Sequence, residues 1–345
     1  MPRHTTALAL TALASSLTLA ACSEPAAEES DAAGATEGSG SAGGALTVYT
    51  SEPQEKIEEL NAAFAQEHPD IEVEVFRAGT GDLTARIATE RETGAIEADV
   101  LLAADTATFE GYKADDLLLE YSPEGADDLL EQVVDPDGFY VGTRIIPTVI
   151  AYNTEEVDDP PTSWADLTDP RWADQIVMPN PDVSGAAAYN AAVWFTTDAL
   201  GEQWFEALGA NSPMIADSNG PTSQAVADGS RPVGVVVDYL IRELAAQGSP
   251  VAVSYPSDGV PYVSQPAGIF ADSDNVEAAQ AYVDFLISEA GQTLAVEQSY
   301  LPVRDDVGSP EGAPSLEELT LLDPELETIT EIRSEAIEAF KNSVG

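Results

Sequence analysis

Three short segments of this 345-residue chain join small or hydroxyl-bearing residues to the expected start of a helix: 80–82 (Thr-Gly-Asp), 184–186 (Ser-Gly-Ala) and 219–223 (Asn-Gly-Pro-Thr-Ser). Backbone N–H groups at a helix N-terminus, at the positive end of the helix dipole, bind phosphate or carboxylate oxygens. Ser, Thr, Asp and Asn are also ordinary N-caps, so capping alone is the alternative interpretation of each segment taken by itself. Segment 184–186 is the strongest of the three, because Gly and Ala leave the backbone accessible to an oxyanion.

Alternating strand and helix patterns must position these segments. Residues 46–49, 71–76 and 98–102 have the apolar content or period-two alternation of strands, and helical spacing separates them. A second unit of the same kind has expected strands at 175–178 and 233–237. This alternation predicts an α/β fold built on parallel sheets with helices on their faces. Ligands of such sheets bind beyond the carboxyl ends of the strands, where the three segments are expected to lie.

The part of the chain after residue 45 is about 300 residues long, which favours two domains over one core. We expect a first lobe formed by 46–148 and 256–345 and a second lobe formed by 149–255. The segments 148–152 and 251–255 are the expected crossings between the lobes.

The N-terminus has the layout of an export signal: a short polar head, an apolar run, and small residues before Cys22. The Leu-Ala-Ala-Cys sequence closely resembles the lipobox at which bacterial lipoproteins are cleaved and acylated. We therefore expect a signal peptide at 1–21, lipidation of Cys22, and an extracytoplasmic protein anchored to the cell membrane. The run is short for a transmembrane helix. Residues 22–45, rich in Ala, Gly, Ser and Glu, are expected to form a flexible linker.

The chain is strongly acidic, with 62 Asp and Glu against 13 Lys and Arg and a formal net charge of −49. Such a surface repels nucleic acid and anionic lipid headgroups, so we expect no nucleic-acid partner and membrane contact only through the lipid. Cys22 is the single cysteine, which excludes an intrachain disulfide and Cys-rich metal sites.

An enzyme is the main competing class of protein. The chain has no Gly-x-Ser-x-Gly elbow, no His-Glu-x-x-His motif and no P-loop. The single histidine after the expected signal, His68, precedes Pro69 in an expected turn, which argues against a Ser-His or Cys-His arrangement. A secreted hydrolase acting on phosphate esters remains the alternative from this class, and turnover of such esters would distinguish it from a binding protein.

Several motifs between residues 46 and 306 carry a family resemblance: LTVYTSEPQEKIEELNAAF, AGTGDLTARI, ADVLLAAD, PTSWADL, PDVSGAAAYN, NGPTSQAVADG and YLPVR. Together they resemble the ferric-type substrate-binding proteins of bacterial ABC importers, a group with phosphonate-binding and sugar-phosphate-binding relatives. The resemblance implies a two-lobed periplasmic-binding-protein fold, each lobe a mainly parallel sheet flanked by helices, with a hinge between them. It also implies a monomeric receptor without a cofactor, which closes over a small solute and docks on a membrane permease.

The resemblance assigns anion binding to Ser184, Gly185, Ala186 and Asn219, with Thr80 and Gly81 facing them from the other lobe. We predict a small phosphorylated or phosphonate solute at these groups. Asp238 would take an ammonium or hydroxyl group of the solute, or would alternatively cap the helix that follows it. The complete expected ligand-binding set is Thr50, Ser51, Thr80, Gly81, Asp105, Ser184, Gly185, Ala186, Asn219, Asp238 and Tyr239.

Ferric iron is the alternative ligand. Tyr239 matches the first of two adjacent tyrosines that hold iron in ferric relatives, but Leu240 follows it. Pro53 occupies the place of a histidine ligand, and Asp105 lies next to the expected carboxylate position. If the solute is an organophosphate, we predict no metal site. If it is ferric iron, we predict Tyr239 as its ligand. Other tyrosines that the sequence does not place could assist it: Tyr49, Tyr140, Tyr189 and Tyr255.

Overall fold

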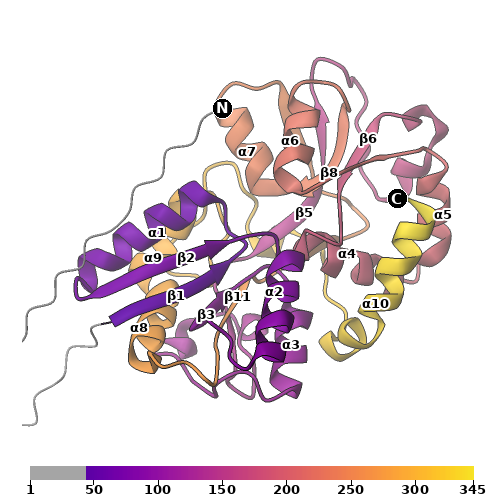
Figure 1. Cartoon of the computed structure of the whole chain (residues 1–345). Helices are drawn as coiled ribbons and strands as arrows, with labels where there is room; N and C mark the ends of the chain where they lie inside the picture. The colour runs from indigo at the N-terminus through magenta and orange to yellow at the C-terminus, as the bar shows by residue number, and fades with distance from the viewer. Residues whose placement is uncertain (1–43) are drawn as a thin grey trace, which may run out of the picture. The chain divides into compact units, whose positions relative to one another are not determined.

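The structure, a computed structural model, describes residues 44–345 (Figure 1). The expected signal peptide 1–21, Cys22 and all but the last two residues of the expected linker lie outside the described residues, so these expectations stay predictions. Within the described part, no helix has both the length and the apolar character that a membrane span needs. Residues 44–345 carry two β-sheets.

The first sheet has the strand order β2-β1-β3-β11-β4. Strands β1, β2 and β3 are parallel, and β11 runs antiparallel to both of its neighbours. The strands are β1 (Gly44–Thr50), β2 (Ile71–Arg77), β3 (Val100–Leu102), β4 (Val141–Gly142) and β11 (Pro266–Ile269). The helices of this sheet are α1 (Gln54–Glu67), α2 (Thr80–Thr93), α3 (Thr106–Ala114), α8 (Val276–Ile287) and α9 (Glu289–Glu297).

Both faces of the first sheet are buried, as expected for a parallel sheet covered by helices. Leu46 and Val48 of β1 belong to one apolar cluster, together with side chains of α1 and α8. Tyr49 points to the opposite face and packs in a second cluster with Leu83 of α2 and Phe109 of α3. Figure 1 shows α8 and α9 near α1, and α2 near α3. The alternation of side chains along β1 therefore fixes which helices cover which face.

The second sheet has the order β12-β10-β5-β8-β6-β7, and β9 also pairs with β5. Strands β6, β7 and β8 are parallel, whereas β5 runs antiparallel to β8, β9 and β10. The strands are β5 (Ile146–Asn153), β6 (Ile176–Pro179), β7 (Met214–Ala216), β8 (Val233–Val237), β9 (Val251–Ser254), β10 (Val260–Val263) and β12 (Leu321–Leu322). The helices are α4 (Gly185–Thr196), α5 (Gly201–Gly209), α6 (Asn219–Ala227), α7 (Asp238–Ala246) and α10 (Leu326–Ser343).

The chain passes between the sheets three times, and two of the connecting segments are short; the third, residues 298–320, leads from α9 to β12. Residues 143–145 join β4 to β5, and residues 264–265 join β10 to β11. The two crossings lie side by side, because the Thr143 N–H donates to the Ser264 carbonyl at 3.0 Å. The segment 148–152, expected as the first crossing, lies inside β5, a few residues after the observed crossing. The one expected at 251–255 is β9, which pairs with β5 at Ile150 to Asn153 and is not a crossing.

The elements after residue 256 divide between the two sheets, which differs from the expected first lobe of 46–148 and 256–345. Helices α8 and α9 do pack with the first sheet's elements. Strands β10 and β12, however, belong to the second sheet, and α10 packs on α4 and α5. The physical reason is the apolar face of α10, where Phe340 meets Phe205 of α5 with ring centroids 5.5 Å apart.

Candidate ligand-binding site

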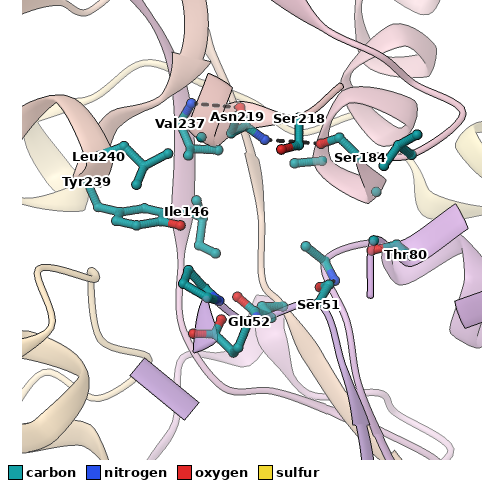
Figure 2. A pocket seen from close by; sticks show the side chains of 18 of the residues that line it. Ser51, Glu52, Thr80, Ile146, Ser184, Ser218, Asn219, Val237, Tyr239 and Leu240 are labelled. Carbon is teal, nitrogen blue, oxygen red and sulfur yellow. Dashed lines mark hydrogen bonds between the residues drawn. The ribbon is translucent and has the colours of Figure 1, made fainter. Parts of the chain in front are cut away.

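A cleft of about 390 Å³ lies among the loops that follow β1, β2, β6, β7 and β8. Its polar lining comes from the ends of these strands and from the first turns of the helices that follow them. Figure 2 shows Ser184 and Asn219 on one side of the cleft, with Ser51 and Glu52 across from them. The cleft therefore occupies the position that ligands take in open α/β sheets.

Ser184 is fixed as a hydrogen-bond donor toward the cleft. It is the N-cap of α4, where its Oγ accepts from the Ala187 N–H at 3.3 Å. The Asn219 Nδ2 group donates to the same oxygen at 3.1 Å, while Asn219 Oδ1 accepts from the Val237 N–H at 3.3 Å (Figure 2). A backbone N–H only donates, so it sets the orientation of the Asn219 amide. Both acceptor positions of the Ser184 oxygen are then used, and its O–H proton remains for a ligand.

The first turn of α4 adds backbone donors beside this hydroxyl. Gly185 and Ala186 both line the cleft, and their N–H groups precede the first intrahelical hydrogen bonds of a twelve-residue helix. The helix dipole places partial positive charge at the same end. Hydroxyl and amide donors without a carboxylate among them suit an oxyanion, as the 184–186 segment predicts.

Thr80 brings the first sheet's side of the site to α4. Its buried hydroxyl has no hydrogen-bond partner among the described residues. A Cβ placed on Gly185 would lie 2.6 Å from the Thr80 Oγ1 and 2.5 Å from the Ala104 carbonyl oxygen. The Gly81 N–H donates to the Val183 carbonyl at 3.2 Å. Helices α2 and α4 thus meet N-terminus to N-terminus, and glycine at 185 is what permits this approach.

A buried ionic cluster at the rim of the cleft does not follow from any sequence motif. Glu52 accepts from the Tyr300 hydroxyl at 3.0 Å, forms an ion pair with Arg144 at 3.1 Å and accepts from the Gln265 side chain. Both charged side chains are only 2% exposed. Arg144 and Gln265 lie on the two crossing segments, so the cluster joins the end of β1 to both of them.

Seven of the expected ligand residues line the cleft: Ser51, Thr80, Ser184, Gly185, Ala186, Asn219 and Tyr239. Glu52, Arg77 and Gln265 also line it and were not predicted. Glu52 and Arg77 each stand at or just beyond a strand end, a signal that could have suggested them.

Thr50 and Gly81 lie outside the lining, although both were expected to bind ligand. The Thr50 hydroxyl is buried and accepts from the Glu52 N–H at 3.1 Å, so it shapes the turn after β1. Gly81 packs so closely on the loop before α4 that a Cβ there would lie 1.8 Å from the Asp182 carbonyl oxygen. Its N–H is already bonded to Val183.

Asp105 and Asp238 are buried in ion pairs away from the cleft lining, contrary to expectation. Asp105 pairs with Arg333 of α10 and accepts from the Thr108 hydroxyl at 2.8 Å. Asp238 pairs with Arg242 at 3.2 Å and accepts from the Tyr255 hydroxyl at 3.0 Å. Burial raises the pKa of Asp238, and the Arg242 charge acts against that rise. The capping alternative does not hold either, because the N-cap of α7 is Val237.

Tyr239 lines the cleft with its ring packed against Tyr300, the centroids lying 4.5 Å apart. Burial raises the pKa of the Tyr239 phenol, which opposes formation of the tyrosinate that Fe(III) prefers. The other tyrosines considered for iron lie outside this lining: Tyr49, Tyr140, Tyr189 and Tyr255. Residues 44–345 contain no group of three His, Cys, Asp or Glu side chains placed to hold a metal ion.

We expect Ser184→Ala to weaken binding of an alkylphosphonate about 10- to 100-fold, because a hydrogen bond to a charged group contributes roughly 1.5 to 3 kcal/mol. Isothermal titration calorimetry measures the change. Ser230→Ala, in the turn after α6 and outside the cleft, is the control that should keep the wild-type affinity. Equal affinity of the Ser184→Ala variant and the control would contradict an anion contact at Ser184.

Two sheets joined by paired crossings, with a cleft at the strand ends, define a two-lobed periplasmic-binding-protein fold. Solved structures with this fold include AfuA from Actinobacillus pleuropneumoniae with bound fructose-6-phosphate (TM-score 0.80, 23% identity, covering 87% of this chain and 98% of that one). Iron-bound HitA from Pseudomonas aeruginosa has the same fold (TM-score 0.76, 23% identity, covering 87% of this chain and 99% of that one). At these identities the likeness establishes the fold alone.

The sequence itself matches the family of bacterial extracellular solute-binding proteins over residues 96–325, which is more than half of the chain. A related protein is a "Probable ABC transporter periplasmic-binding protein" of Sinorhizobium fredii, 28% identical over 253 residues, which cover 70% of this chain and 68% of that protein. The chain therefore belongs to the family of bacterial extracellular solute-binding proteins.

Proposed function

We propose that this chain is the membrane-anchored receptor of an ABC importer, and that its cleft holds a small phosphorylated or phosphonate solute. The observation that carries the choice of ligand is the donor set at the start of α4. It consists of a Ser184 hydroxyl whose acceptor positions are filled by Asn219 and Ala187, and the first-turn amides beside it. Fructose-6-phosphate bound to AfuA gives a precedent for a phosphorylated ligand on this fold.

The remaining parts of the proposal follow from the sequence. Residues 1–21 direct export, acylated Cys22 anchors the mature chain to the membrane, and a permease in that membrane accepts the solute. The receptor acts as a monomer, binds without a cofactor and does not turn its ligand over. Incorporation of labelled palmitate should be lost in a Cys22→Ala variant, which should move from the membrane fraction to the soluble fraction. Unchanged membrane retention of that variant would contradict the anchor.

A thermal-shift panel tests the choice of ligand. A solute that binds only the folded state at 100 times its Kd stabilises that state by about 2.7 kcal/mol, which is roughly 5 °C in a protein of this size. We expect glucose 6-phosphate or an alkylphosphonate to give such a shift and Fe(III) to give none. A shift with iron alone, with a visible tyrosinate charge-transfer band, would overturn the proposal.

Ferric iron stays the second candidate because Tyr239 lines the cleft beside Tyr300 and iron-bound HitA shares the fold. Against it, Glu52 already engages Arg144, Tyr300 and Gln265, so the tyrosine has no free carboxylate to assist it in the lining. The hydrolase alternative has no supporting observation in the cleft.

The acidic surface should slow capture of an anionic solute. With a net charge of −49, the chain repels an anion at long range, and salt screens this repulsion beyond about 8 Å at physiological ionic strength. We expect the association rate of an alkylphosphonate to rise as NaCl increases from 20 to 300 mM, measured by stopped-flow fluorescence. A rate that falls or stays constant with salt would contradict an anionic solute.

A further inference from the structure

Among residues 44–345, Arg77 is the one basic residue that lines the cleft, and it forms no ion pair with a carboxylate. It is the last residue of β2, where its backbone pairs with Thr50 at the end of β1. Ten of the twelve Lys and Arg residues in the described part of the chain form ion pairs. The exceptions among residues 44–345 are Arg77 and Arg231. Arg77 is exposed and has no carboxylate partner among these residues, so its guanidinium is available to a ligand in the cleft.

One hydrogen bond already orients this guanidinium. The Arg77 Nε–H donates to the Glu52 carbonyl oxygen at 2.9 Å. The two terminal nitrogens make no hydrogen bond to any other described residue. A guanidinium that is held through Nε, with both terminal nitrogens free, can donate two parallel hydrogen bonds to a planar or tetrahedral anion.

The cleft offers no matching place for a cationic group. Glu52 is the only carboxylate in its lining, and its oxygens are taken by Arg144, Tyr300 and Gln265. Asp238, the residue expected to accept an ammonium group, is buried against Arg242 and Tyr255. A solute with an ammonium at its far end would therefore meet a free guanidinium and no free carboxylate.

We infer that the solute carries a second anionic group, and that Arg77 binds it while the phosphate or phosphonate sits at the start of α4. This inference rests on the proposed function and narrows it to doubly acidic solutes, such as phosphonocarboxylates, over hexose phosphates and aminoalkylphosphonates. Arg77 is a specificity-determining residue in this account. Its charge adds affinity for the second acid group without contributing to the site at Ser184.

Calorimetry with matched pairs of probes tests the inference. The probes are phosphonoacetate, 3-phosphonopropionate and 4-phosphonobutyrate, each paired with the alkylphosphonate that has a methyl group in place of the carboxylate. We expect at least one phosphonocarboxylate to bind about 10- to 100-fold tighter than its partner, the range of a charge-assisted hydrogen bond. The corresponding aminoalkylphosphonate should bind no tighter than the alkylphosphonate.

Arg77→Gln should reduce the preference for the phosphonocarboxylate over the alkylphosphonate to about twofold or less. The affinity for the alkylphosphonate itself should change about threefold or less. Arg231→Gln removes the same charge from the other unpaired arginine, outside the cleft, and should keep the full preference. Arg77→Lys keeps the charge but loses the bidentate fork and the Nε anchor, so the preference should fall severalfold.

The outcomes separate this inference from the proposed function. If alkylphosphonates bind but wild-type protein shows no preference for the carboxylate, or Arg77→Gln keeps that preference, the inference is overturned and the proposed function stands. If no phosphonate binds but glucose 6-phosphate does, the inference alone is overturned. If neither class of compound binds, the inference and the proposed ligand class are both overturned. A missing preference in the wild-type protein overturns the inference by itself, so this arm of the test does not depend on the folding of a variant.

Discussion

Gly185→Val should abolish binding of phosphorylated or phosphonate solutes, with a loss of affinity of about 100-fold or more. Even a Cβ at this position would lie 2.5 Å from the Ala104 carbonyl oxygen and 2.9 Å from the Thr80 Cβ. Interiors as closely packed as this one cannot absorb such an overlap without moving backbone. Relief therefore requires α2 and α4 to separate, which opens the donor set at the start of α4.

The fold itself should survive this substitution. Thr80 and Ala104 lie on elements of the first sheet, whereas Gly185 starts a helix of the second, so separation of the two sheets relieves the overlap. Calorimetry with an alkylphosphonate measures the loss, and circular dichroism checks the fold. Gly111→Ala in α3 is the control, because a Cβ there meets nothing within 4 Å. If the Gly185→Val variant binds with wild-type affinity, the contact between α2 and α4 is not part of the binding site.

The second large effect is expected at Glu52. Glu52→Ala leaves Arg144 buried without its carboxylate, and breaking a buried ion pair in this way costs about 3 to 5 kcal/mol of unfolding free energy. The Tyr300 hydroxyl and the Gln265 amide lose an acceptor at the same time. Urea unfolding followed by tryptophan fluorescence measures the change in free energy.

Two comparisons show whether burial causes this loss. Glu97→Ala breaks an ion pair with Arg86 in which Glu97 is 68% exposed, and it should cost about 1 kcal/mol or less. The double variant Glu52→Met with Arg144→Met removes both buried charges and should be more stable than Glu52→Ala alone. Equal small losses for Glu52→Ala and Glu97→Ala would show that the buried cluster does not stabilise the junction of the two sheets.

Local pattern was sufficient to predict five of the described strands and three neighbouring residues of the cleft lining. Ser184, Gly185 and Ala186 are neighbours in sequence, and their place in the cleft lining follows from the start of a single helix. The apolar strands β1, β2, β3, β6 and β8 were likewise predicted from short stretches of sequence. In these cases the information lies within a few consecutive residues.

The missed features depend on partners far along the chain. Asp105 forms an ion pair with Arg333, 228 residues later in the chain, and Glu52 accepts a hydrogen bond from Gln265, 213 residues later. No local pattern indicates such pairs, so a side chain held by a distant partner could not be distinguished from a free ligand-binding group. The second crossing was misplaced for a related reason: β9 and β10 are both short apolar strands, and only their pairing with β5 distinguishes them from a crossing.

The central claim is that an oxyanion binds at the start of α4. A crystal structure of the protein with an alkylphosphonate tests it most directly. The account predicts phosphonate oxygens within hydrogen-bond distance of the Ser184 hydroxyl and of the Gly185 or Ala186 amide. A phosphonate bound elsewhere, with these three donors left to solvent, would contradict it.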